Sequence, residues 1–323
     1  MTRVGLLGAG GMGSVHAAQY AKMTDVELRF FDPRPDQAER FQSRFHAEPC
    51  RSEDDLIDWA DVVDVCTPTD THHALGRKAI AAGRALLMEK PLCRTLGECE
   101  GLMAAAEKAG VPAMPAQVVR YFPEYAAAKR MVESGAVGDV AAVRLRRGGG
   151  APSGVDGWFM DHARSGGVFF DLAIHDFDWI RWALADVATV YAKSLKANVG
   201  HGPDYGLATL TLENGAVAHV EATWMDPSGF RTTFEVCGSG GMILHDSRLT
   251  PSVRVHREGG SVTESPLAPQ DDPYYREIRA FLEAVWRKER PPVTLEDGFA
   301  ACAVALAALE SAQTGLPVRP ARP

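Results

Sequence analysis

Asp171 and His175 offer the first piece of chemistry in the chain. They stand four residues apart in the segment SGGVFFDLAIHDFD (165–178), a spacing that puts both side chains on one face of a helix. A carboxylate beside an imidazole sets the tautomer of the ring and raises its basicity, which suits a general base near neutral pH. A satisfied pair on a helix surface has the same spacing, so the pattern leaves both interpretations open.

Lys90 is the second candidate, in the tetrapeptide MEKP that completes the apolar run 85–88. The run predicts a buried parallel strand, and α/β sheets bind ligands at the carboxyl ends of such strands. A lysine there would face a ligand bound at that edge and could stabilise a developing alkoxide. A solvated surface lysine is the alternative.

The segment CTPTDTHH (66–73) follows another β-branched run, residues 62–66. Its place after a predicted parallel strand favours Thr67, Pro68 and His72 as residues that line a cofactor. In the alternative interpretation, Pro68 only ends the strand and His72 lies in the first turn of a helix.

The N-terminal stretch VGLLGAGGMGSVHA (4–17) predicts a strand, a glycine-rich turn and a helix, and fits the dinucleotide pattern G-x-G-x-x-G. The first glycine allows the tight turn, the second lets a pyrophosphate approach the backbone, and the third lets the helix pack on the strand. Phosphates would then lie on N–H groups at a helix start. The residues assigned to this turn are Gly8, Gly10, Gly11, Met12 and Gly13.

Asp32 ends the next predicted strand, residues 26–31, where a carboxylate accepts hydrogen bonds from an adenosine ribose. Its charge would repel a 2′-phosphate, so the sequence favours NAD. Arg34 could still accommodate that phosphate, which leaves NADP possible.

The elements that must position these residues alternate between strand and helix over the first 120 residues. Such alternation predicts a parallel sheet with helices on both faces, a Rossmann domain. Thr95 and Glu98 predict a capping box. After the first unit, strands are expected at 26–31, 62–66, 85–88 and 111–114, and helices at 35–46, 52–59, 72–82 and 95–109.

After residue 120 strands follow one another without helices between them, which predicts a largely antiparallel sheet with one face covered by helices and the other free for a partner. Asn214-Gly215 predicts a hairpin turn. The division is therefore 1–120 and 121–323, with the C-terminal helix able to pack back on the first domain. Strands are expected at 140–146, 187–197, 206–212, 216–224 and 231–236, helices at 123–134, 166–184, 274–288 and 295–314, and loops at 148–154 and 269–273.

Composition excludes several classes of protein. A formal charge of −8, from 34 basic and 42 acidic residues in 323, gives no footprint for nucleic acid or an anionic membrane. The longest apolar run, 299–309, is too short to span a bilayer. Six cysteines without a C-x-x-C pair predict reduced thiols in the cytoplasm. Adjacent His72 and His73 cannot share a helix face, and neither H-E-x-x-H nor G-x-S-x-G occurs, so no metal and no serine acyl transfer are expected.

In combination, GAGGMG, TPTDTH, AAGRALLMEKP, the segment around Arg120 and SGGVFFDLAIHDFD resemble the glucose-fructose oxidoreductase and inositol dehydrogenase family over nearly the whole chain. The resemblance implies a Rossmann domain followed by an α/β domain with an open, mostly antiparallel sheet. The exposed face of that sheet commonly makes a subunit interface, so a homodimer or homotetramer is expected.

The same resemblance implies roles for individual residues. Lys90 would contact both the nicotinamide and the reacting hydroxyl, with His175 as proton acceptor and Asp171 as its partner. Glu89 of the E-K-P motif and Gln117 would belong to the cofactor site, although family members often carry Asn where Gln117 or Val118 stands. Two further residues would line the substrate pocket: Arg120 and Trp158.

We therefore expect an NAD-dependent dehydrogenase that oxidises a secondary hydroxyl of an inositol or sugar-like polyol to a ketone. The wording IHDFD is similar to inositol dehydrogenases, whereas EATWMDPSGF around Trp224 is similar to uncharacterised sugar oxidoreductases of the family. From the residues alone, core positions are favoured for Trp158 and Trp224. Two other functions remain open: a redox-neutral glycosidase or lyase that keeps NAD bound, and a nucleotide-sensing protein without turnover.

Overall fold

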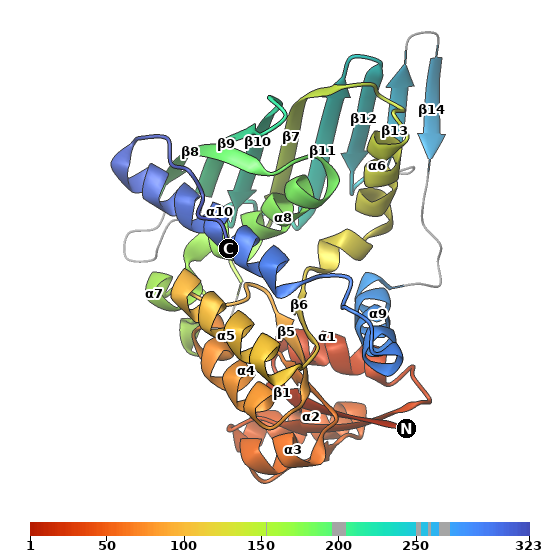
Figure 1. Ribbon diagram of the computed structural model, residues 1–323, viewed down its shortest axis with the longest axis vertical. Coiled ribbons are helices and arrows are strands. Elements are labelled where there is room, and N and C mark those ends of the chain that lie inside the picture. The colour runs from red at the N-terminus through yellow and green to blue at the C-terminus, as the bar shows by residue number, and fades with distance from the viewer. Residues whose placement is uncertain (153, 196–204, 250–252, 258–259, 265–271) are drawn as a thin grey trace. The chain divides into compact units, whose positions relative to one another are not determined.

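The computed structural model describes residues 1–152, 154–195, 205–249, 253–257, 260–264 and 272–323 (Figure 1). The chain divides into two compact units. Unit 1 comprises Met1–Gln117 and Asp271–Phe299, and unit 2 comprises Val118–Gln270 and Ala300–Pro323. Within the described residues, no helix is both long and apolar enough to cross a membrane.

Unit 1 contains a six-stranded sheet in the order β3-β2-β1-β4-β5-β6, and every neighbouring pair is parallel. The predicted Rossmann domain is confirmed. Strands β4 and β5 are buried along their whole length, as expected for central strands of a sheet covered on both faces. The strands are β1 (Thr2–Leu7), β2 (Val26–Phe31), β3 (Glu48–Pro49), β4 (Val62–Val65), β5 (Ala85–Glu89) and β6 (Ala113–Ala116).

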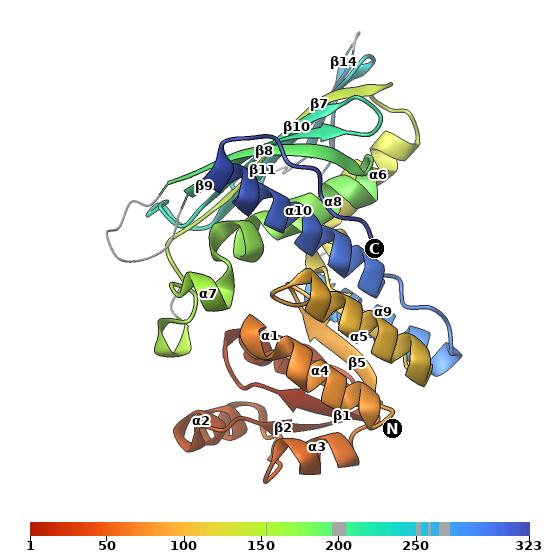
Figure 2. The same cartoon turned by 60° about the vertical axis from the view of Figure 1, so that its left-hand side comes forward.

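Local sequence signals set several helix ends of unit 1. Ser52 caps α3 by accepting a hydrogen bond from the Asp55 N–H, and Thr95 with Glu98 forms the predicted capping box of α5. Helices α4 and α5 pack side by side, and so do α1 and α9 (Figures 1 and 2). The helices are α1 (Gly11–Tyr20), α2 (Pro35–Phe45), α3 (Glu53–Trp59), α4 (His72–Ala81), α5 (Leu96–Ala109) and α9 (Pro273–Arg287).

Unit 2 contains an eight-stranded sheet in the order β14-β13-β12-β11-β7-β10-β9-β8. All neighbouring pairs are antiparallel except β7 and β10, so the largely antiparallel prediction is confirmed. The predicted hairpin joins β9 to β10, with Gly215 at φ 87°. The strands are β7 (Val140–Gly148), β8 (Val187–Leu195), β9 (Tyr205–Leu212), β10 (Val217–Thr223), β11 (Arg231–Gly238), β12 (Gly241–Asp246), β13 (Val253–Arg257) and β14 (Gly260–Glu264).

Helices cover one face of this sheet, as Figures 1 and 2 show for α6 (Pro123–Glu133), α8 (Ile174–Ala183) and the unit 2 part of α10 (Leu295–Thr314). Tyr125 and Trp179 from the helices pack against Phe234 of β11 in the core between them. Alternate residues of each strand point to the opposite face, which the helices leave open.

The predicted helix 166–184 is wrong at its start. The short α7 (His162–Ser165) ends at Gly166 and Gly167, which adopt φ 78° and 70°, left-handed values that interrupt a helix. A π-helical turn then spans Phe169–Ala173, and regular helix begins only at Ile174. Asp171 therefore lies in a widened turn and not on a regular α-helical face with His175.

Other boundaries differ by small amounts. Strand β6 begins two residues later than predicted and ends at Ala116, and strands β12, β13 and β14 carried no expectation. Three-residue and four-residue 3₁₀ turns precede α4 (Thr69–Thr71) and α6 (Val118–Tyr121), and another spans Val155–Gly157. The last two residues of the predicted strand 187–197 and residues 269–271 of the predicted loop lie outside the described residues.

Candidate active site

The glycine turn of unit 1 contains two different kinds of glycine. A Cβ on Gly13 would lie 2.0 Å from the Gly8 carbonyl oxygen, and one on Gly8, which adopts φ 95°, would lie 2.6 Å from the Cys66 carbonyl oxygen. A Cβ on Gly10 or Gly11 would meet nothing within 4 Å among the described residues. Gly13 is required where α1 packs on the turn, and Gly8 is required by its left-handed backbone and the approach of the Cys66 carbonyl, whereas Gly10 and Gly11 leave space above the turn.

That space suits an anion. Helix α1 begins at Gly11, its N-cap Gly10 has no side chain to accept from the first N–H groups, and its first turn carries no acidic residue. The positive end of the helix dipole and its N–H groups are therefore available to a phosphate. The Met12 side chain is partly buried and packs against the core cluster that includes Phe30, so it anchors the turn to the core.

Asp32 and Arg34 are brought together at the end of β2. The Asp32 carboxylate accepts hydrogen bonds from the Ala9 N–H at 2.9 Å and from the Arg34 Nε and Nη2 atoms at 2.8 Å each. Burial opposes the charge, but these donors outweigh it and lower the pKa of Asp32 below its usual value. Asp32 is thus an ionised acceptor fixed beside the glycine turn.

The loops after β4 and β5 are joined by a buried histidine. His72 Nδ1 lies 2.9 Å from the Pro91 carbonyl oxygen, and its Nε2 lies 3.0 Å from the Thr67 carbonyl oxygen. Burial lowers the pKa of His72, an effect that the two carbonyls partly oppose. The Thr67 hydroxyl bonds the Thr71 hydroxyl at 2.6 Å, which turns the chain after Pro68. His72 and Thr67 therefore shape the edge of the sheet.

Lys90 follows β5 at this edge and is half-buried. The preceding Glu89 is buried, and one oxygen of its carboxylate accepts the Lys90 N–H at 2.9 Å. At the end of the neighbouring β6, Gln117 is 1% exposed, and neither its Oε1 nor its Nε2 has a hydrogen-bond partner in the part of the chain that the structure describes. A buried amide of this kind at a strand end is a group that a ligand would satisfy.

The two acidic residues of the segment IHDFD (174–178) in unit 2 each bind a different arginine. Asp176 binds Arg147 through both carboxylate oxygens at 2.7 and 3.1 Å, and Asp178 binds Arg120 in the same way at 2.6 and 2.7 Å. All four side chains are buried. Arg120, expected to line the substrate pocket, therefore has its guanidinium engaged by Asp178 in the core of this unit.

Asp171 and His175 are only half-buried, unlike Asp176 and Asp178. The Asp171 carboxylate accepts a hydrogen bond from the Trp224 Nε1 atom at 3.3 Å. Trp224 is buried, at 6% exposure, and this contact makes it a neighbour of the candidate catalytic pair.

An aromatic series accompanies this carboxylate. Trp158 stacks on Phe159 with ring centroids 3.9 Å apart, and Phe159 meets Trp224 edge-on at 6.5 Å. Indole faces suit the C–H faces of a sugar or cyclitol ring. No motif in the sequence pointed to Phe159.

Sequence reasoning also missed a polar cluster in unit 1. His16, Asp64 and Cys66 are buried, and their potential ligand atoms lie within 4.8 Å of one another. His16 Nδ1 and Asp64 Oδ2 are 2.8 Å apart, a hydrogen-bond distance, so the two groups bind each other. The available signals were a histidine one turn into the glycine-motif helix and an aspartate inside the β-branched strand VVDV.

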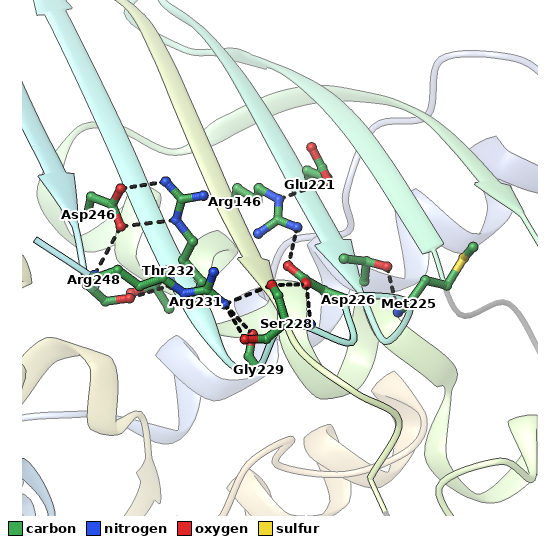
Figure 3. Close-up of polar contacts among 12 residues, drawn as sticks. Arg146, Glu221, Met225, Asp226, Ser228, Gly229, Arg231, Thr232, Asp246 and Arg248 are labelled. Carbon is green, nitrogen blue, oxygen red and sulfur yellow. Dashed lines mark hydrogen bonds and ion pairs between the residues drawn. The ribbon is translucent and has the colours of Figure 1, made fainter.

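The open face of the unit 2 sheet carries a separate network (Figure 3). Arg146 of β7 binds Glu221 of β10 at 3.2 Å and Asp226 at 2.8 Å. Arg248 donates to the carbonyl oxygens of Ser228 and Gly229, at 3.0 and 2.8 Å, which holds the loop after Asp226. These residues lie on the face opposite the helices and contribute ordered charge to it.

The parallel sheet, the glycine turn and the carboxylate at the end of β2 define an NAD-binding Rossmann oxidoreductase. Family models agree: the NAD-binding Rossmann-fold domain of the GFO/IDH/MocA oxidoreductases matches residues 2–117, and the GFO/IDH/MocA C-terminal domain matches residues 125–244. The chain belongs to the GFO/IDH/MocA family, and it is an NAD-dependent oxidoreductase that acts on CH–OH groups of polyols or sugars.

Three similar proteins illustrate the range of the family. The chain is 30% identical over 339 residues to scyllo-inositol 2-dehydrogenase (NAD(+)) of Bacillus subtilis (strain 168), covering 98% of this chain and 96% of the relative. It is 29% identical over 325 residues to inositol 2-dehydrogenase of Rhizobium meliloti (strain 1021), covering 96% of each. The crystal structure of GenD2 from gentamicin A biosynthesis in complex with NAD matches with a TM-score of 0.88 at 26% identity, covering 98% of this chain and 96% of that one.

Substitution by alanine should affect stability differently at the two kinds of glycine. Gly13→Ala forces the new Cβ against the Gly8 carbonyl and should lower the free energy of unfolding by about 1–3 kcal/mol or more. Gly10→Ala, the matched control, should leave stability nearly unchanged while weakening NAD binding, because its methyl group enters the space above the turn. Thermal unfolding and NAD titration of both variants measure this; equal stability of the two would contradict the packing argument.

Asp32→Ala should weaken NAD binding roughly ten- to hundred-fold, the effect of losing a charged hydrogen-bond acceptor at the ribose. NADP binding should fall much less, because Arg34 is released from Asp32 and becomes available to a 2′-phosphate. Calorimetric titration with both nucleotides gives the ratio. Equal losses for NAD and NADP would mean that the carboxylate does not face the ribose.

Proposed function

We propose that this oxidoreductase oxidises a secondary hydroxyl of an inositol or sugar-like polyol to a ketone, with Lys90, Asp171 and His175 as catalytic residues. The observation that carries the proposal is the separation of acids in the segment 171–178. Asp176 and Asp178 are consumed by buried arginines, whereas Asp171 and His175 stay half-buried. A carboxylate and an imidazole therefore stand at partly exposed positions, where a substrate could reach them.

The cofactor half of the proposal rests on the fit of unit 1 to a dinucleotide. The space above Gly10 and Gly11 would take the pyrophosphate, Asp32 the adenosine ribose, and the buried amide of Gln117 a polar group of the cofactor. When bound, NAD accepts the hydride that leaves the carbon of the reacting hydroxyl.

The chain's own residues would manage the proton and the charge. His175 takes the hydroxyl proton as general base, and Asp171 holds the ring in the correct tautomer and stabilises its positive charge. The Lys90 ammonium stabilises the negative charge that develops on the oxygen. The half-buried indole of Trp158 would contact the C–H face of the ring and orient it, with Phe159 and the buried Trp224 packed behind it.

We also propose that the protein acts in the cytoplasm as a homodimer or homotetramer joined through the open face of the unit 2 sheet. Apolar side chains stand exposed on that face, among them Tyr191 of β8 at 41% and Leu207 of β9 at 39% exposure, and Leu207 is the strand partner of Glu221. An open antiparallel face that mixes apolar and ordered charged groups is suited to a specific subunit interface.

Replacing Lys90 or His175 by Ala should lower kcat roughly 10²- to 10⁴-fold while NAD still binds, because each removes a group that acts on the reacting hydroxyl. Lys78→Ala, which removes a surface lysine paired with Glu53 and Asp54, should leave kcat unchanged. Rates are followed by absorbance of the reduced nicotinamide across a panel of inositols, aldoses and sugar acids.

Near-normal rates in both variants would refute the assigned mechanism. If the wild type is silent across the whole panel although it binds NAD, the redox-neutral enzyme or the nucleotide sensor becomes the better proposal. A redox-neutral enzyme would retain its cofactor through purification and require none to be added.

Leu207→Glu should convert the oligomer to monomers at micromolar concentration, because a charge would be buried at the subunit interface. Trp286→Glu, at 38% exposure on α9 of unit 1, is the control for a new charge at an equally exposed apolar position. Light scattering after size-exclusion chromatography gives the mass of each variant. A monomeric wild type would contradict this interface.

A further inference from the structure

One fully buried ring in unit 1 joins three elements beneath the glycine turn. His16 lies on α1, its Nδ1 is 2.8 Å from Asp64 Oδ2 on β4, and its Nε2 is 3.2 Å from Glu89 Oε1 on β5. Asp64 also accepts the Tyr20 hydroxyl at 2.8 Å. None of His16, Asp64 and Tyr20 has a part in the catalytic roles assigned above.

The two carboxylates determine how many protons this ring carries. A neutral imidazole has one N–H, so it would direct a lone pair at either Asp64 or Glu89. An imidazolium donates from Nδ1 to Asp64, and its positive charge stands at ion-pair distance from the Glu89 carboxylate, although Nε2 lacks hydrogen-bond geometry to it. Burial opposes that charge, but the Asp64 carboxylate outweighs it and raises the pKa of His16 well above its ordinary value.

The second carboxylate oxygen of Glu89 contacts the backbone of Lys90, the proposed catalytic lysine. Glu89 Oε2 accepts the Lys90 N–H at 2.9 Å, while Oε1 faces His16. The carboxylate is therefore engaged at both ends, by the ring and by the backbone of Lys90. Helix α1, whose first residues form the phosphate-binding turn, is thereby linked through two side chains to the residue that bears the ammonium group.

Building on the proposed function, we propose that His16 is a positioning residue that acts through Glu89 to hold Lys90 in place relative to the glycine turn. Without the ring, Glu89 is a buried carboxylate that lacks its charged partner, an unfavourable state that turning toward water relieves. Such a turn removes the acceptor from the Lys90 N–H. The ammonium group then loses the fixed position that stabilisation of an alkoxide requires.

His16→Gln and Tyr20→Phe form a matched pair for the test. Both residues are buried on α1 and both contact Asp64, but only His16 reaches Glu89. The protein is treated with limiting acetic anhydride in the absence of NAD. Mass spectrometry then gives the rate of acetylation of Lys90 relative to that of Lys78. We expect several-fold faster labelling of Lys90 in His16→Gln and an unchanged rate in Tyr20→Phe.

The kinetic readout separates positioning from loss of folded protein. In His16→Gln, kcat should fall roughly ten- to hundred-fold, as for a small displacement of a catalytic group, with NAD affinity nearly unchanged. The isotope effect on kcat with substrate deuterated at the reacting carbon should rise, because hydride transfer becomes slower than the other steps. A smaller folded fraction would lower kcat without changing the isotope effect.

If His16→Gln does not fold, Glu89→Gln is the substitute variant. The side-chain amide oxygen of the new glutamine can still accept the Lys90 N–H, but the negative charge that attracts His16 is gone. This variant should show the same faster labelling in weaker form. Identical labelling rates and kcat values in His16→Gln and Tyr20→Phe would overturn the proposal. If the wild type oxidises no polyol but the labelling difference persists, the proposed function fails and the positioning role stands.

Discussion

The burial of charge at the carboxyl ends of β4 and β5 constrains the rest of unit 1. These strands have no exposed face, so Asp64 and Glu89 cannot be hydrated and must be compensated from within the protein. A single imidazole on α1 lies between them. The helix that begins with the glycine turn is consequently tied to the two strands whose ends carry the Thr67 loop and Lys90.

A second histidine braces the same edge by other means. His72 lies between the Pro91 and Thr67 carbonyl oxygens, and its single N–H in the neutral form can donate to either of them, so it joins the two loops through backbone groups. The two histidine rings therefore stabilise different parts of this edge. His16 links the helix to the strands, and His72 links one loop to the next, which leaves Lys90 attached to a framework fixed on both sides.

Signals that act within a few residues were readable from the sequence. The capping box of Thr95 and Glu98, the glycine turn and the hairpin at Gly215 each depend on neighbours in the chain, and the structure contains all three. The partners of buried charges were not readable, because Asp178 meets Arg120 and His16 meets Asp64 only after folding brings distant segments together. A sequence shows that a charge is present but not which segment neutralises it.

The π-turn at Asp171 shows how the backbone conformation of two glycines overrides the periodic pattern of the residues that follow them. The spacing of Asp171 and His175 favoured one regular helix, but Gly166 and Gly167 adopt left-handed backbone, and a Cβ at Gly166 would lie 2.7 Å from Phe170. The chain therefore enters α8 through a widened turn, a feature frequently found at functional sites. That turn carries Asp171 to the Trp224 indole while Asp176 and Asp178, further along, enter the core. A segment with three acids thus acquires two structural carboxylates and one accessible one, and the accessible one is the acid for which a catalytic role can be argued.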